Sequence, residues 1–191
     1  MRSVSEDQRV NRNSREPAKT DTDGSRRWVG YLHWLREDIV QGVLDLPEAE
    51  RRTSRLPSGW SPIELLSHVL HMEQRWFVWG FLGESVGSPW GDWSEGDPPH
   101  TERRGPDAPR WAVAADVTVE HLVTELRAVG ARTSEIIESH RPDAVAAVGG
   151  RFSEDPPTLE WICFHVLAEY ARHAGHLDIV VEHSKDERER T

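Results

Sequence analysis

The apolar residues of this chain recur at intervals of three and four over four long stretches, and this spacing restricts the fold more than any other feature of the sequence. It is the spacing of amphipathic helices, each of which must bury one face. The stretches cover residues 28–46, 62–83, 119–137 and 159–183. No segment of any length shows the alternating pattern of a strand. The sequence therefore predicts an all-α fold, a four-helix bundle around one core.

The segments between and beyond these stretches predict two tails and one long connection. Residues 1–26 contain almost no large apolar side chains and are expected to be a disordered tail, and residues 184–191 are expected to be a charged tail. The connection over 83–116 has 34 residues with five Gly, five Pro and three Trp, far more than a helix hairpin requires. It predicts a crossover that makes helices two and three parallel, within one domain over residues 27–183.

The beginning of the second helix is marked by residues 61–64, with the sequence SPIE. Ser61 is an N-cap residue, Pro62 occupies the first helical position and Glu64 follows three residues after the cap. This is the pattern of a capping box combined with an N-terminal proline. The sequence therefore fixes where this helix starts.

Composition excludes several classes of protein. The chain has 23 basic and 33 acidic residues, a net charge of -10, so no nucleic-acid partner is expected. The longest apolar runs are far too short to span a membrane, and the N-terminus lacks the apolar segment of a secretion signal, so a cytoplasmic location is expected. The single cysteine, Cys163, excludes an internal disulfide or a multi-cysteine metal site. Any metal must be held by histidine and carboxylate.

Three histidines and a glutamate gather on one face of the predicted fourth helix. At about 100° per residue, Glu169, His173 and His176 all fall within about 80° of His165. Residues four apart are neighbours on a helix surface, so Glu169 and His173 can reach one ion. This pair is the first half of a predicted metal site.

A third ligand must come from another helix. His68, in the middle of the second helix among apolar residues, is the best candidate, and His71 is the second choice. Two histidines and one carboxylate form a known catalytic zinc set with an open fourth position, and they also suit nickel or iron(II). A structural interpretation competes, because a lone helical histidine is more often packed than metal-bound and Glu169 with His173 is also an ordinary i,i+4 pair.

Two segments that contain these candidate ligands resemble a known protein family. The stretch GWSPIELLSHVLHMEQRW (59–76), followed by a long connection and then EYARHAGHLDIVVEH (169–183), resembles the DinB-like superfamily, in particular its mini-circle-type actinobacterial branch. The similarity covers roughly residues 27–183. In that superfamily a tryptophan near the start of helix two precedes a metal-binding histidine, as Trp60 precedes His68 here.

The fourth helix of the superfamily supplies two ligands four residues apart, the second just before a small residue and glycine. Glu169 and His173, followed by Ala174 and Gly175, match this motif. Many relatives have histidine at the first position, whereas the mycothiol-dependent maleylpyruvate isomerases have glutamate, as this chain does. The resemblance implies an up-down-down-up bundle and a divalent metal, most often used with a low-molecular-weight thiol such as mycothiol or bacillithiol.

The sequence and the resemblance together favour a metal-dependent enzyme, with zinc as the expected metal. The expected activity is that of a mycothiol-type thiol transferase or isomerase acting on a small electrophile. One alternative is a metal-dependent hydrolase that uses bound water. Another is a non-catalytic binding or stress-response module that forms a homodimer. Thiol affinity would separate the first two classes.

The remaining candidates flank the predicted ligands. Arg75 and Trp79 share the face of His68 and could hold an anionic or apolar part of a substrate, although both also suit core packing. His176 is a candidate general base or a hydrogen-bond partner, and Cys163 is expected to be a buried structural thiol. Three tryptophans of the long connection are expected to cover the open end of the bundle: Trp90, Trp93 and Trp111.

Overall fold

The computed structural model describes residues 16–20, 22–94 and 110–190, and its regular secondary structure there is helical. The long elements are α1 (Gly24–Leu44), α2 (Pro62–Glu73) with its π-helical continuation η3 (Gln74–Phe81), α3 (Val119–Ser139) and α4 (Leu159–Glu189). A short 3-10 turn, η2 (Glu48–Glu50), lies between α1 and α2. The predicted all-α bundle is confirmed.

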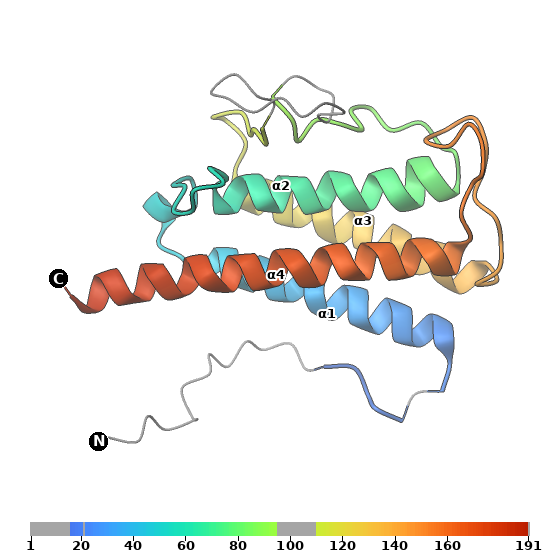
Figure 1. The fold of residues 1–191 in the computed structure, drawn as a ribbon, viewed down its shortest axis with the longest axis horizontal. Helices are drawn as coiled ribbons and strands as arrows, with labels where there is room; N and C mark the ends of the chain where they lie inside the picture. Colours follow the sequence, from blue (N-terminus) through green and yellow to red (C-terminus); the bar gives the residue numbers. More distant parts are fainter. Residues whose placement is uncertain (1–15, 21, 95–109, 191) are drawn as a thin grey trace.

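The helices follow one another in up-down-down-up order. In Figure 1, α1 and α4 run in one direction and α2 and α3 in the other. α1 packs against α3 and α4, while α2 packs against α3 and α4. The chain after η3 returns along α2 before α3 begins, so α2 and α3 are parallel, as the length of their connection predicted (Figure 1).

The start of α2 is the capping box that the sequence predicted, because the Ser61 N–H donates to the Glu64 carboxylate at 2.7 Å. The start of α1 differs from the prediction. This helix begins at Gly24, within the segment expected to be a tail, because the Asp23 carboxylate accepts a hydrogen bond (3.2 Å) from an N–H of the first turn. Residues 1–15 of the expected tail lie outside the described residues.

The end of α4 also differs from the prediction. The helix continues past His183 to Glu189, through most of the segment expected to be a charged tail. Ser184 is fully buried, and Glu187 forms an ion pair with Arg55 at 2.6 Å. These contacts hold the last turns of α4 against the connection between α1 and α2.

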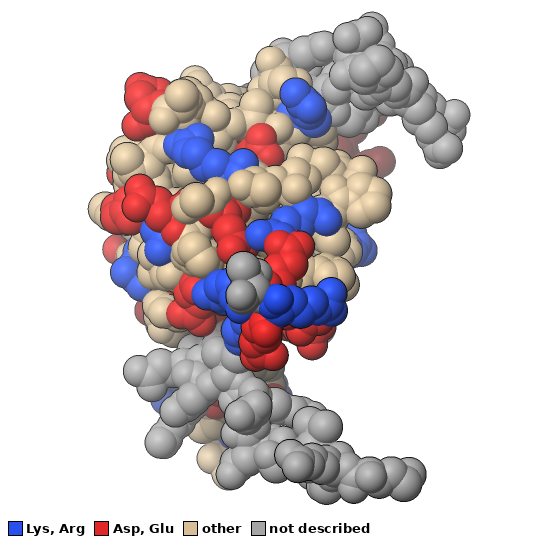
Figure 2. All heavy atoms as spheres, turned by 90° about the vertical axis from the view of Figure 1, so that its left-hand side faces the viewer, with Lys and Arg blue, Asp and Glu red and all other residues tan. Residues whose placement is uncertain are grey.

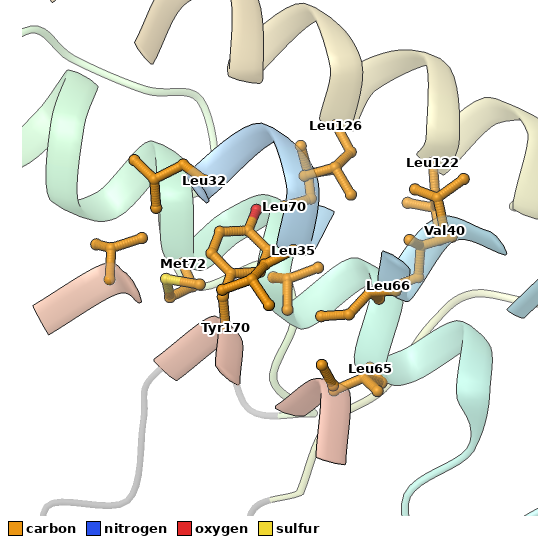
Figure 3. Close-up of a cluster of buried hydrophobic side chains, with 14 of the residues drawn as sticks. Leu32, Leu35, Val40, Leu65, Leu66, Leu70, Met72, Leu122, Leu126 and Tyr170 are labelled. Carbon is orange, nitrogen blue, oxygen red and sulfur yellow. The ribbon is translucent and has the colours of Figure 1, made fainter. Parts of the chain in front are cut away.

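One hydrophobic core lies between the four helices. Figure 3 shows side chains from every helix meeting in it: Leu32, Leu35, Leu66, Leu70, Leu126 and Tyr170. At the end of the bundle where α4 finishes, acidic and basic side chains are interspersed, with no continuous basic patch (Figure 2). Among the described residues, no helix is long and apolar enough to cross a membrane.

The core also encloses a charged group, which we call the core cluster: Arg36, Glu73 and Tyr170. The Glu73 carboxylate accepts two hydrogen bonds from Arg36 (2.7 and 3.0 Å) and one from the Tyr170 hydroxyl (2.5 Å). All three residues are buried, and Glu73 is completely so. Gly130 of α3 leaves room for the guanidinium, since a Cβ there would lie 2.6 Å from Arg36 Nε.

The π-helical segment η3 changes the direction of the side chains that follow α2. Its wider turn is shown by the Leu82 N–H, which donates to the Phe77 carbonyl five residues earlier at 3.2 Å. π-helical turns occur frequently at functional sites. In this chain the segment carries Arg75, Trp76 and Trp79, so the even 100° spacing used to place them from the sequence does not apply beyond Glu73.

Candidate functional site

His68 is buried on α2 and is held by a carboxylate from the connection after η3. Its Nδ1 lies 2.8 Å from Oδ2 of Asp92, which is completely buried. Arg75 binds the same carboxylate through two nitrogens, at 2.5 and 3.1 Å, and also donates to the Pro89 carbonyl at 2.8 Å. We call His68, Asp92, Arg75 and the nearby His173 the site cluster.

The electrostatics of this group favour one position for the His68 proton. Burial acts to raise the pKa of Asp92, but hydrogen bonds from His68 and Arg75 outweigh it and hold that pKa below its ordinary value. Burial lowers the pKa of His68, although Asp92 opposes the shift. An ionised Asp92 can only accept hydrogen bonds, so the neutral His68 ring carries its proton on Nδ1. Its Nε2 then keeps a lone pair that can bind a ligand.

Asp92 was missed by the sequence analysis. It lies in the short segment Trp90-Gly91-Asp92-Trp93, where an acidic residue stands between two tryptophans. That local composition was the one signal available. Its pairing with a histidine 24 residues earlier follows from the path of the connection over α2, which sequence spacing does not determine.

His173 and Glu169 face His68 from α4. The rings of His68 and His173 meet edge to face with their centroids 4.9 Å apart, and His173 Nε2 lies 3.6 Å from a Glu169 oxygen. Both ring nitrogens of His173 are buried and have no hydrogen-bond partner. Burial, followed by the nearby charges of His68, His176 and Arg172, lowers the pKa of His173 to about 3. The imidazole is therefore neutral and has unused lone-pair capacity.

Tryptophans lie over this pair of histidines. Trp111 stacks on His68 with centroids 3.9 Å apart at 19°, and it contacts His173 at 5.4 Å. Trp93 and Trp60 pack against Trp111, at 6.4 and 6.3 Å, and all three line a pocket of about 200 Å³. Two of the three tryptophans predicted to cover the site therefore lie there. Trp90 does not, and instead packs against guanidinium groups.

The other candidates are distributed around the site. His176 is exposed, with its ring 6.2 Å from that of His173. His71 points to the neighbouring turn, where its Nδ1 lies 2.8 Å from the Ser67 carbonyl oxygen. His165 stacks on Trp161 with the ring centroids 5.1 Å apart. Arg75 lies behind His68 with its guanidinium already bound to carboxylate.

Cys163 is buried, as expected for a structural thiol. Burial, with a smaller contribution from Glu160, raises the pKa of this thiol to about 12. A thiol in this state is protonated at neutral pH and is a poor nucleophile.

The structure brings His68, Glu169 and His173 together, but it does not display a finished metal site. Within residues 16–20, 22–94 and 110–190, no three His, Cys, Asp or Glu side chains form a group that could hold a metal ion as they stand. The Glu169 carboxylate is engaged by Arg172 at 2.9 Å, and the two histidine rings are at 75° to each other. The ligand set stays a prediction.

The up-down-down-up helical bundle agrees with the DinB-like fold that the sequence resemblance implied. A family model described as mycothiol-S-transferase matches residues 27–185, so the chain belongs to the mycothiol-S-transferase family. No curated protein and no solved structure matches it. Membership supports a mycothiol-related transferase activity in general, with mycothiol as the co-substrate.

Proposed function

We propose that this protein is a metal-dependent enzyme that joins a mycothiol-type thiol to a small electrophile, as a transferase or isomerase. The observation that carries the proposal is the buried His173 imidazole, whose two nitrogens have no partner. A buried polar group without a partner costs about 1–3 kcal/mol. A divalent ion bound there would offset this cost.

The chemistry of the proposed donor set suits such an ion, although the three side chains must reorient to bind it. His68 offers Nε2 because Asp92 occupies Nδ1, and a carboxylate behind a ligating histidine is the usual arrangement at metal sites. His173 offers a second imidazole and Glu169 a carboxylate. Zinc accepts two histidines and one carboxylate and keeps a fourth position open, so we propose zinc, with nickel or iron(II) as compatible ions.

When bound, the ion would favour the thiolate form of a thiol, whose free pKa is about 8.5. The protein's own residues orient the His68 ring and exclude water. Asp92 keeps the proton on His68 Nδ1 and fixes the ring, and Arg75 acts through Asp92 as a positioning residue. Trp111 covers His68 and excludes water from that side.

His176 is the residue that we assign as the base, because it is exposed beside His173. Its imidazole accepts the proton of the thiol. The sulfur then forms a bond to the electrophilic carbon, and a leaving group departs with its electron pair where the electrophile carries one. In an isomerisation the same sulfur adds and is later expelled.

Metal content tests the ligand assignment. Protein purified without added metal should contain one divalent ion per chain by elemental analysis. His173→Ala should lose it, His68→Ala should lose most of it, and His121→Ala, an exposed histidine on α3, should keep it. Wild-type metal content in both site variants would show that the ligands are wrong.

Activity tests the reaction class. The metal-loaded protein should conjugate mycothiol to a halo-nitroarene at a rate that saturates with thiol, and Glu169→Ala should abolish the reaction. Substrate turnover that is equally fast with water alone would favour the hydrolase. The absence of measurable thiol binding to the metal-loaded protein would eliminate the transferase.

A further inference from the structure

A second guanidinium lies next to the site cluster and has no acidic partner. Arg151 belongs to the connection between α3 and α4, and its Cζ lies 4.3 Å from the centre of the Trp76 ring and 5.3 Å from that of Trp90. Its Nη1 is buried and makes no hydrogen bond. Among the described residues, no carboxylate forms an ion pair with it or raises its pKa. Within the described part of the chain, the contacts seen for this cation are thus with aromatic rings.

The backbone presents Arg151 in a fixed position. Gly149 has a φ of 102°, which favours glycine, and a Cβ on Gly150 would lie 2.8 Å from the Cα of Gly83. The N–H of Arg151 donates to the Trp79 carbonyl at 3.3 Å. The turn is therefore attached directly to the end of η3, and the guanidinium is preorganised rather than free on a loop.

Arg151 differs from Arg75, although both guanidinium groups lie over Trp90. Arg75 is neutralised by Asp92, whereas Arg151 is partly buried without an anion. Burial, and to a smaller degree the charge of Arg75, lower the pKa of Arg151 to about 10. The group is still charged at neutral pH, so it is a desolvated cation that an anionic ligand would stabilise.

Arg151 lies close enough to the proposed metal-ligating residues for one small molecule to contact both. Trp76, which lies under Arg151, also contacts His165 with centroids 4.2 Å apart. The charges of Glu169 and Arg151 both act on His165. His165 precedes Glu169 by four residues, about 6 Å along a helix. A small molecule could therefore touch the Arg151 group at one end and the proposed metal ligands at the other.

We propose that Arg151, between Trp76 and Trp90, binds the carboxylate of a flat, aromatic acid, and that this acid is the electrophile. The identification of the ligand as the electrophile rests on the proposed function, whereas the anion subsite does not. Trp76 and Trp90 pack against the guanidinium, so its N–H groups are what an anionic ligand would bind. A carboxylate is planar and accepts two parallel hydrogen bonds from such N–H groups. The faces of Trp76 and His165 suit an aromatic body.

The test compares 4-chloro-3-nitrobenzoate with its methyl ester, with mycothiol as the thiol in both cases. In the reaction the sulfur–carbon bond forms, the carbon–chlorine bond breaks, chloride leaves with the electron pair and the thiol proton is released. The wild-type ratio of kcat/KM for the acid to that for the ester should fall at least tenfold in Arg151→Gln. Arg141→Gln removes the same charge from an exposed site in the same connection and should keep the wild-type ratio. An unchanged ratio in Arg151→Gln would overturn the proposal.

A binding measurement separates this inference from the proposed function. Calorimetric titration of the protein with 3-nitrobenzoate, without thiol, should give an affinity that Arg151→Gln weakens at least tenfold and Arg141→Gln leaves unchanged. If neither aryl chloride reacts but this Arg151-dependent binding is observed, the transferase fails and the anion subsite stands. Equal affinity in wild type and Arg151→Gln, or no binding to wild type, would overturn the subsite. Circular dichroism melting of each variant verifies that it is folded.

Discussion

The core cluster and the site cluster both take residues from α2 and α4, yet they differ in how completely their polar atoms are paired. In the core cluster the Glu73 carboxylate binds Arg36 and Tyr170. In the site cluster Asp92 satisfies His68 Nδ1, but His173, three residues after Tyr170, has two buried nitrogens without a partner. The fully paired carboxylate of the core cluster suits a structural role, whereas the unpaired nitrogens of His173 are the feature on which the proposed ligand site rests.

The largest expected effect comes from breaking the core cluster. Glu73→Gln keeps the shape of the side chain but leaves the Arg36 charge buried without its counter-ion. Removing one partner of a buried ion pair costs about 3–5 kcal/mol of unfolding free energy. Urea denaturation followed by circular dichroism measures this, with Glu84→Gln, an exposed partner of Arg132, as the control with a change below about 1 kcal/mol. A loss below 1 kcal/mol for Glu73→Gln would show that the cluster is not a structural element.

A smaller loss should follow from crowding the core cluster. Gly130→Ala places a methyl group 2.6 Å from Arg36 Nε and should cost about 1–3 kcal/mol, because the guanidinium must move. Gly175→Ala on α4 has nothing within 4 Å and should instead stabilise metal-free protein by about 0.5–1 kcal/mol. Thermal and urea unfolding of the two variants should therefore shift in opposite directions. A stabilising Gly130→Ala would mean that Arg36 does not need this gap.

The smallest expected effect is a change in unfolding free energy that has opposite signs for one substitution in each cluster. In metal-free protein, His173→Leu removes a buried imidazole that has no partner, and it should raise the unfolding free energy by on the order of 1 kcal/mol. Tyr170→Phe, one turn earlier, removes a hydroxyl that is paired and should lower it by about 0.5–1.5 kcal/mol. Added zinc should stabilise the wild type but not His173→Leu. Equal destabilisation by both substitutions would remove the distinction between the clusters.

The sequence was most informative about local structure. The apolar spacing and the SPIE start signal predicted four helices, and the 34-residue connection predicted that α2 and α3 are parallel. It also placed His68, Glu169 and His173 on facing helices, since residues on one helix face are set by the 3.6-residue period. The predicted helix ends were less accurate. α1 begins earlier because Asp23 caps it, and α4 continues further because Ser184 and Glu187 make tertiary contacts.

Tertiary structure decided which of these groups are paired. Arg36 meets Glu73 across 37 residues and Asp92 meets His68 across 24, and no pattern in the sequence specifies such partners. Arg75 lies on the same side as His68, but Asp92 binds its guanidinium, and the turn at Gly149 places Arg151 over Trp76. Helical periodicity is a local property of the backbone and can be predicted from the sequence alone. The pairing of buried charges depends on the path of connections, which only the packed chain determines.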